Sequence, residues 1–147
     1  MPIYPACVGL RSILAFRRGT KVPDRPEWLH EIKHDGYRLI VQRQGKRVRL
    51  FTRNGDDWSH RFPLIVEAAL RNRQSSFVID GEAVLLGVEG KSDFNGLHSR
   101  QHDEEVQFYA FDMLVSDGDD IRNLPLTMRK GEPDQAPRAA SRWHLPE

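Results

Sequence analysis

The chain has 147 residues, of which 39% are hydrophobic and 29% are charged, and its formal net charge is +1. This length suits one domain with a real core and is small for a multi-domain enzyme. No apolar run reaches the roughly 18 residues of a membrane span, and the single Cys7 excludes an intramolecular disulfide or a multi-cysteine metal site. We therefore expect a soluble, cytoplasmic protein with no membrane partner.

Charge is divided unevenly along the chain. Residues 17–61 contain 12 Lys or Arg and 6 Asp or Glu, whereas residues 78–120 contain 2 and 11. A basic segment beside an acidic one suits a site that binds phosphates and metal ions. From charge alone, two solvated faces of opposite sign are the simpler interpretation.

The predicted elements begin after a proline-containing, extended lead-in over residues 1–24. Alternating apolar and polar residues on both sides of the turn Gln44-Gly45-Lys46 predict a β-hairpin over residues 37–53. Lys33 comes just before Gly36 and the first of these strands. We expect this lysine at a sheet edge rather than on an open helix.

The next segments predict one helix and two short strands. Apolar residues at helical spacing predict a helix over residues 60–72, opened by Ser59 and Pro63. Two runs of β-forming residues, 77–79 and 83–88, stand on either side of Asp80-Gly81-Glu82. Without other information, that Asp-Gly-Glu sequence is equally well interpreted as a polar β-turn.

The remaining segments complete a mixed fold. Residues 92–103 predict a short helix or loop, residues 106–115 the most apolar strand, and residues 116–119 a turn. The sum is the α+β class, with largely antiparallel sheets and flanking helices. Residues 131–147 have no periodicity and predict a disordered tail.

The segment Lys33-His34-Asp35-Gly36-Tyr37-Arg38 contains the first residues with chemical interest. A lysine amine attacks phosphorus only when neutral, which requires desolvation or neighbouring cations to lower its pKa. Arg38, and Arg53 across the hairpin, are cations that suit this task and also bind phosphate or ribose oxygens. A lysine met without a motif is normally a solvated surface residue.

This segment has the form K-x-D-G-x-R, the signature shared by DNA ligases, RNA ligases and mRNA capping enzymes. Phe51–Gly55, Val78–Val84 and Phe108–Leu114 resemble the motifs that follow it in DNA ligases, in the same order. Residues 27–31 and 94–100 further resemble bacterial ATP-dependent ligases of the end-joining type. The resemblance covers residues 25–130 and implies a partial ATP-grasp-like nucleotidyltransferase, or adenylation, domain.

The resemblance implies a reaction with ATP, Mg²⁺ and nicked double-stranded DNA. Lys33 would attack the α-phosphate of ATP, release pyrophosphate and form lysyl-AMP, and nick sealing in DNA repair and recombination would follow. Without the motif, Phe111 would be interpreted as a core aromatic residue. The implied nucleotide contacts are Glu31 at the adenine edge, Arg38 and Arg53 at the ribose and phosphates, Glu82 at a ribose hydroxyl or metal ion, and Phe111 against adenine. His34, His98 and His102 lack a convincing set of metal-ligand partners and are not expected to bind a metal.

Later parts of the family pattern are expected to be missing. The family's second metal-binding glutamate and its K-x-K motif have no counterpart after residue 130, and residues 131–147 contain no lysine. One hypothesis is an out-of-frame tail on a decayed ligase gene product with impaired activity. The other is a short protein whose partner supplies the rest of the domain.

Two further functions are compatible with the sequence. One is a non-catalytic module that binds nucleotide or DNA through the basic hairpin. The other is an RNA ligase or capping enzyme, which shares the lysine motif but fits residues 78–114 less well.

Overall fold

The computed structural model describes Pro26 and residues 33–130. The expected lead-in, Glu31 and the expected tail at 131–147 lie outside the described residues. In chain order the elements are strands β1 (Tyr37–Gln44) and β2 (Arg47–Thr52), helix α2 (Pro63–Arg71), strand β3 (Ser76–Val84), helix α3 (Phe94–Ser99), the 3₁₀ turn η1 (Asp103–Glu105), strands β4 (Gln107–Ser116) and β5 (Asp119–Asp120), and helix α4 (Leu126–Lys130).

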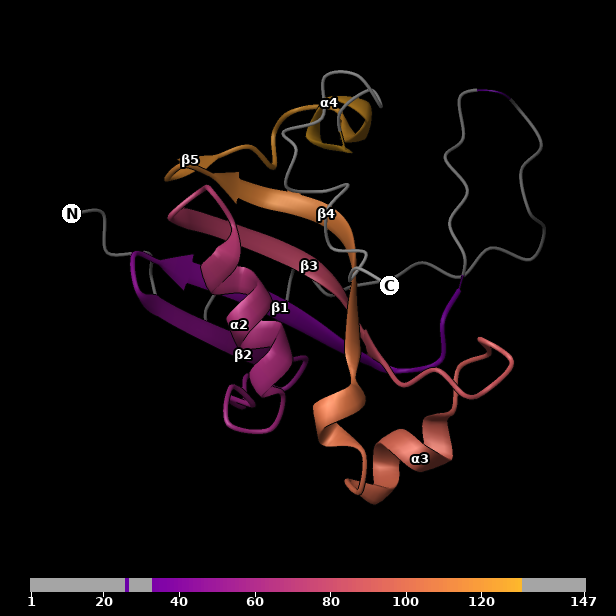
Figure 1. Ribbon diagram of the computed structural model, residues 1–147. Helices are drawn as coiled ribbons and strands as arrows, with labels where there is room; N and C mark the ends of the chain where they lie inside the picture. The colour runs from indigo at the N-terminus through magenta and orange to yellow at the C-terminus, as the bar shows by residue number, and fades with distance from the viewer. Residues whose placement is uncertain (1–25, 27–32, 131–147) are drawn as a thin grey trace.

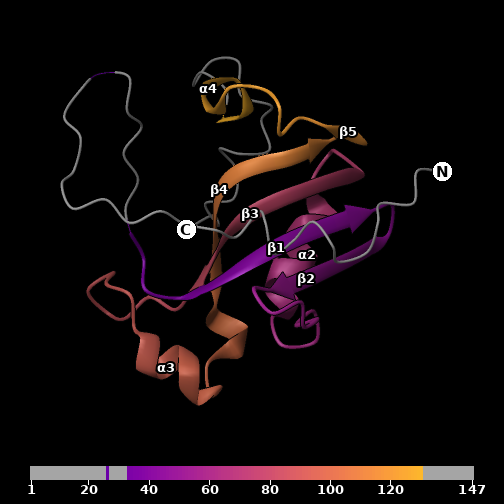
Figure 2. The same cartoon turned by 180° about the vertical axis from the view of Figure 1, so that it is seen from behind.

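The five strands form one sheet in the order β2-β1-β3-β4-β5, and every neighbouring pair is antiparallel. Helix α2 lies across one face of the sheet, in front of β1 and β2 in Figure 1 and behind β1 in the reverse view of Figure 2. The expected α+β fold with a largely antiparallel sheet is confirmed.

The predicted hairpin is formed by β1 and β2. Their register runs from Leu39 opposite Thr52 to Gln44 opposite Arg47, which leaves a two-residue turn. Gly45 occupies this turn with a φ of 58°, a left-handed conformation that glycine adopts without steric cost. The glycine that marked the turn in the sequence is therefore the residue that permits it.

Strand β3 differs from the prediction. It runs without interruption through Asp80-Gly81-Glu82, so the turn considered there does not form. The second predicted run, 83–88, is strand only as far as Val84, and Leu86 makes an isolated bridge to Ser92. The reason is tertiary: β1 and β4 pair with β3 on both sides, and their hydrogen bonds outweigh the local turn preference of Asp-Gly.

Helix α2 is shorter than the predicted range and begins differently. Pro63 occupies its first turn, as predicted, but the preceding residue is Phe62 and no side chain caps the helix. Ser59 does not open the helix, because its hydroxyl accepts a hydrogen bond from the Leu50 amide at 2.9 Å. None of the helices in residues 33–130 has both the length and the apolar character needed to cross a bilayer.

The two faces of the sheet carry different side chains, because successive strand residues point to opposite sides. The main core lies on the side of α2 and α3, whereas a smaller cluster of Ile40, Phe51 and Leu114 lies on the other side. Arg38, Asp80, Glu82, Tyr109 and Asp112 share that second side by strand register, and we call it the polar face. The main core consists of Leu39, Val41, Leu50, Phe62, Ile65, Ala69, Phe77, Ile79, Ala83, Leu85, Leu97, Val106, Phe108 and Met113.

Gly81 is the position at which β3 depends most on a missing side chain. A Cβ there would lie 2.3 Å from the Tyr109 carbonyl oxygen and 2.5 Å from the Phe108 ring. We expect Gly81→Ala to lower the free energy of unfolding by about 1–3 kcal/mol, as overpacking of a close-packed site does. Urea unfolding measures the change.

Gly87→Ala is the matched control, because a Cβ at Gly87 would meet nothing closer than the Lys91 carbonyl oxygen at 3.6 Å. This variant should unfold close to the parent. Equal unfolding midpoints for the two variants would contradict the packing assigned to Gly81.

Candidate functional site

Lys33 lies shortly before the start of an inner strand. It precedes β1 by four residues, and β1 is flanked by β2 and β3. Its side chain is exposed. Lys33 lies outside any helix, as expected, but the strand that follows it is an inner strand and not the expected sheet edge.

Gly36 fastens the segment after Lys33 to β3. Its amide donates a hydrogen bond to Glu82 Oε1 at 3.1 Å. A Cβ at position 36 would lie 2.1 Å from the Ala83 carbonyl oxygen, which is closer than real Cβ contacts. The glycine of the K-x-D-G-x-R segment is therefore required by the approach of this backbone to β3.

Two more contacts hold the residues between Lys33 and Gly36. The rings of His34 and Tyr109 lie with their centroids 4.0 Å apart and their planes at 31°. The Asp35 amide donates to Ser92 Oγ at 3.2 Å. The segment is thus attached to β4 and to the loop after β3, in addition to its bond with Glu82.

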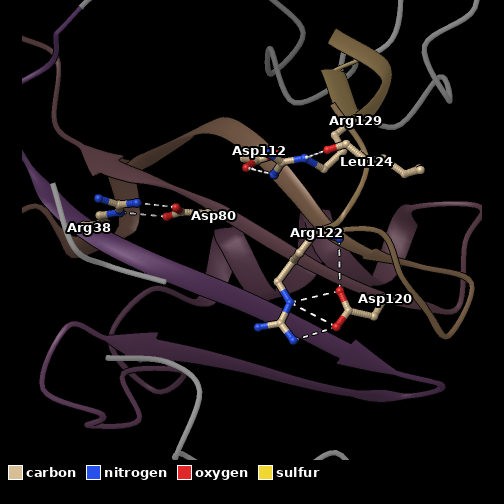
Figure 3. Close-up of polar contacts among 7 residues, drawn as sticks. All are labelled: Arg38, Asp80, Asp112, Asp120, Arg122, Leu124 and Arg129. Atoms are coloured by element: carbon tan, nitrogen blue, oxygen red, sulfur yellow. Dashed lines mark hydrogen bonds and ion pairs between the residues drawn. The ribbon is translucent and has the colours of Figure 1, made fainter. Parts of the chain in front are cut away.

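Arg38 is paired with Asp80 across β1 and β3 (Figure 3). Its Nε donates to Oδ1 at 2.9 Å and its Nη2 to Oδ2, the two-point geometry in which arginine binds carboxylates most firmly. The Asp80 residue is 4% exposed. Sequence reasoning named Arg38 but not this partner, which only the β1–β3 register reveals.

Glu82 is half-buried, on the strand position directly opposite Arg38. Burial raises the pKa of the Glu82 carboxyl above its usual value of 4.5, with a further contribution from the charge of Asp35. The Gly36 hydrogen bond and the charges of Arg38 and Lys33 oppose this rise. The charges of Lys33 and Arg38 therefore both act on the Glu82 carboxyl, which lies at one end of the polar face.

A second ion pair, between Asp112 of β4 and Arg129 of α4, also lies on this face (Figure 3). Burial raises the pKa of Asp112, the positive charge of Arg129 opposes the rise, and the charge of Asp80 adds to it. Asp80 and Asp112 are direct neighbours across β3 and β4. On the neighbouring strand β5, hydrogen bonds from Arg122 lower the pKa of Asp120 to about 2.

The remaining predicted nucleotide contacts are Arg53, Phe111 and Glu31. Arg53 lies in an exposed turn after β2. Phe111 is half-buried at a register shift between β3 and β4, and it belongs to neither hydrophobic cluster. Glu31 is outside the described residues. Within residues 33–130, no three His, Cys, Asp or Glu side chains come together as a metal site.

The aromatic cluster around Arg61, on the opposite side of the sheet from the polar face, was not predicted from the sequence. The Arg61 guanidinium is buried and lies 4.5 Å from the Trp58 ring centroid and 5.2 Å from that of Tyr37. It donates to Asp103 Oδ2 at 3.0 Å and to the Leu97 carbonyl at 2.8 Å. This arginine ties the start of β1 to α3 and η1.

An antiparallel sheet with a lysine, an arginine and a carboxylate at one end is an arrangement suited to a phosphate-bearing ligand. Comparison with known proteins agrees with this class. The family model of the ATP-dependent DNA ligase domain matches residues 16–132, so the chain belongs to that family.

Proteins of bacterial end joining are among the most similar relatives. The multifunctional non-homologous end joining protein LigD of Pseudomonas aeruginosa is 37% identical over 111 residues, which cover 74% of this chain and 13% of that protein. The Mycobacterium tuberculosis protein of the same type is 39% identical over 92 residues, 63% of this chain and 12% of its own length. The predicted resemblance to end-joining ligases is confirmed.

Solved structures give the same result. The crystal structure of the ligase domain from M. tuberculosis LigD matches with a TM-score of 0.59 and 34% identity, over 67% of this chain and 33% of that chain. A mycobacterial DNA ligase D complexed with ATP and MES matches with a TM-score of 0.58 over the same shares. The chain thus spans about a third of the solved ligase domains.

The raised pKa of Glu82 makes a prediction about stability and pH. Between 4.5 and the raised folded-state pKa, the folded protein binds more protons than the unfolded chain, so stability falls as pH rises through this window. Glutamine cannot ionise, and its side-chain oxygen still accepts from Gly36. We expect Glu82→Gln to unfold at a higher temperature than the parent at pH 7 and to lose this advantage below about pH 4.

Thermal unfolding at a series of pH values measures the difference. Glu104→Gln is the control, because Glu104 is exposed, and it should show no comparable pH-dependent gain. A Glu82→Gln variant that is less stable than the parent at pH 7 would sink this prediction.

Proposed function

We propose that Lys33 accepts AMP from ATP, so that this chain provides the nucleophile of a ligase adenylation reaction. The observation that carries the proposal is that Arg38 lies opposite Glu82 at one end of the polar face and that the charge of Lys33 also acts on the Glu82 carboxyl. The K-x-D-G-x-R segment and the family membership supply the reaction type. The relative complexed with ATP supports this choice of nucleotide.

In the proposed step, the neutral Lys33 amine attacks the α-phosphorus of ATP. A nitrogen–phosphorus bond forms, the bond from the α-phosphorus to the bridging oxygen breaks, pyrophosphate leaves, and the amine gives up a proton. Transfer of this kind depends mainly on positioning and on stabilising the phosphate charges. The contacts of His34, Asp35 and Gly36 provide positioning for the attacking segment.

Mg²⁺, when bound with ATP, would neutralise phosphate charge. Glu82 fits a role beside such an ion, because Mg²⁺ in nucleotide sites is often held by one or two carboxylates together with phosphates and water. The half-buried setting of Glu82 at the strand end is compatible with that arrangement.

The remaining nucleotide contacts belong to the same proposal. Phe111 is half-buried outside both hydrophobic clusters, which is suitable for a ring that stacks on adenine. Arg38 is held by Asp80 and so has a fixed direction from which to meet ribose or phosphate oxygens. The full proposed set is Glu31, Arg38, Arg53, Glu82 and Phe111, and the complete family reaction on nicked double-stranded DNA is proposed with it.

Labelling with α-³²P-ATP and Mg²⁺ tests the nucleophile. We expect covalent label on the parent chain and at least a hundredfold less on Lys33→Ala, because Lys33 is the lysine of the K-x-D-G-x-R segment. Lys46→Ala should label like the parent, because Lys46 is an exposed residue of the hairpin turn. An unlabelled parent, or equal label on Lys33→Ala, would reject the proposal.

A second function, DNA binding through the basic hairpin, is favoured by the directions of two arginines. Arg47 and Arg49 alternate with Val48 and Leu50 on the outer strand β2, and Leu50 is in the main core. The two arginines therefore project on the side away from α2. Such a pair suits two phosphates of a nucleic-acid backbone.

Salt dependence of DNA binding tests this second function. Replacing Arg47 and Arg49 by glutamine should weaken binding and reduce the slope of log K against log salt by about 2, one unit for each lost phosphate contact. The control replaces Arg71 and Arg100, which are exposed at the ends of α2 and α3, by glutamine. Equal effects of the two pairs on the slope would argue against the hairpin as the binding surface.

A further inference from the structure

We propose that His34 and Tyr109 position Lys33, so that His34 is a positioning residue acting through the contact of its ring with that of Tyr109. The inference rests on the proposed function, because it concerns the adenylation of Lys33. It adds a role for two residues that the nucleotide contacts above do not include.

The first argument is the location of the two rings. His34 is bonded directly to Lys33 in the chain, and its ring centroid lies 4.0 Å from that of Tyr109. Tyr109 belongs to β4, a strand hydrogen-bonded to β3 over most of its length. This ring contact therefore connects the neighbour of the nucleophile to a rigid part of the sheet.

The second argument is the partner of Tyr109 across the strands. Tyr109 lies directly opposite Glu82 in the β3–β4 register. Glu82 accepts the amide hydrogen of Gly36, two residues after His34. One cross-strand pair thus holds the Lys33-containing segment at two points, with the Glu82 carboxylate at Gly36 and the Tyr109 ring at His34.

The third argument concerns what each contact fixes. The Gly36 hydrogen bond and the Asp35–Ser92 bond attach the two residues nearest to β1 to Glu82 and to the loop after β3. Among the contacts described for this segment, that of the His34 ring is the nearest to Lys33 in the chain. Because a shift of about 1 Å in a reacting group can slow a reaction up to about a hundredfold, the contact nearest the amine matters most.

The chemistry of the contact predicts which side chains can replace histidine. An aromatic pair at this distance is held by its ring faces and not by the imidazole nitrogens. Phenylalanine at position 34 should therefore keep the function, whereas alanine should lose it. A role of His34 in proton transfer would give the opposite result, since phenylalanine has no proton to exchange.

The test measures the rate of self-labelling by α-³²P-ATP in the full 147-residue chain. We expect His34→Ala to lower the rate at saturating ATP about two- to tenfold with the half-saturating ATP concentration unchanged. His34→Phe should stay within about twofold of the parent. His60→Ala, which removes an exposed histidine elsewhere, should label like the parent.

Coupling between the two rings is tested with Tyr109→Ala. This variant should slow labelling as His34→Ala does, and the double variant should be no slower than either single variant. Additive losses, a rate for His34→Phe as low as that for His34→Ala, or an unchanged rate for His34→Ala would each overturn the inference.

Amide hydrogen exchange tests the positioning role of His34 independently of whether Lys33 is labelled. His34→Ala should accelerate exchange of the Asp35 and Gly36 amides, whereas His34→Phe should not, with unfolding midpoints equal in all three proteins. If the parent does not label, the proposed function fails, and the exchange result alone decides whether the His34–Tyr109 ring contact holds the segment. Unaltered exchange in His34→Ala would then reject it.

Discussion

Strand β3 is hydrogen-bonded along both of its sides, to β1 and to β4, and the contacts around Lys33 depend on this double pairing. The pairing with β1 sets Arg38 opposite Glu82, and the pairing with β4 sets Glu82 opposite Tyr109. The pairing with β4 brings Phe108 and Tyr109 against Gly81, where a side chain has no room. A local change in β3 would therefore displace the partners of Arg38, His34 and Gly36 together.

Carboxylates on the polar face lower the stability of the fold. Asp80 and Asp112 face each other across two strands, an arrangement of like charges that is unfavourable by itself. Each carboxylate is compensated by an arginine from a different element, Arg38 of β1 and Arg129 of α4. Burial of Glu82 adds a further cost, which is typical of sites whose charged groups are retained for binding.

Local patterns in the sequence were sufficient for the hairpin, helix α2 and strand β4, because alternation, helical spacing and Gly45 act within a few residues. They were insufficient at Asp80-Gly81-Glu82, where pairing with two distant strands decides the conformation. The partners of Arg38 and Arg61 lie 42 residues away in each case, at Asp80 and Asp103, and such contacts depend on sheet register rather than on local spacing. Lys33 and Glu82 were predicted as site residues only because their motifs resemble those of ligases.

The tight contact of Gly36 with the Ala83 carbonyl bears on how such motifs are interpreted. In K-x-D-G-x-R, the glycine is explained by backbone packing and the arginine by its pairing with Asp80, before any nucleotide is considered. Part of what identifies the family in a sequence search is therefore a requirement for folding. A relative that had lost its lysine would still be under selection to keep the glycine, and finding the signature in a genome is stronger evidence for this sheet than for the reaction.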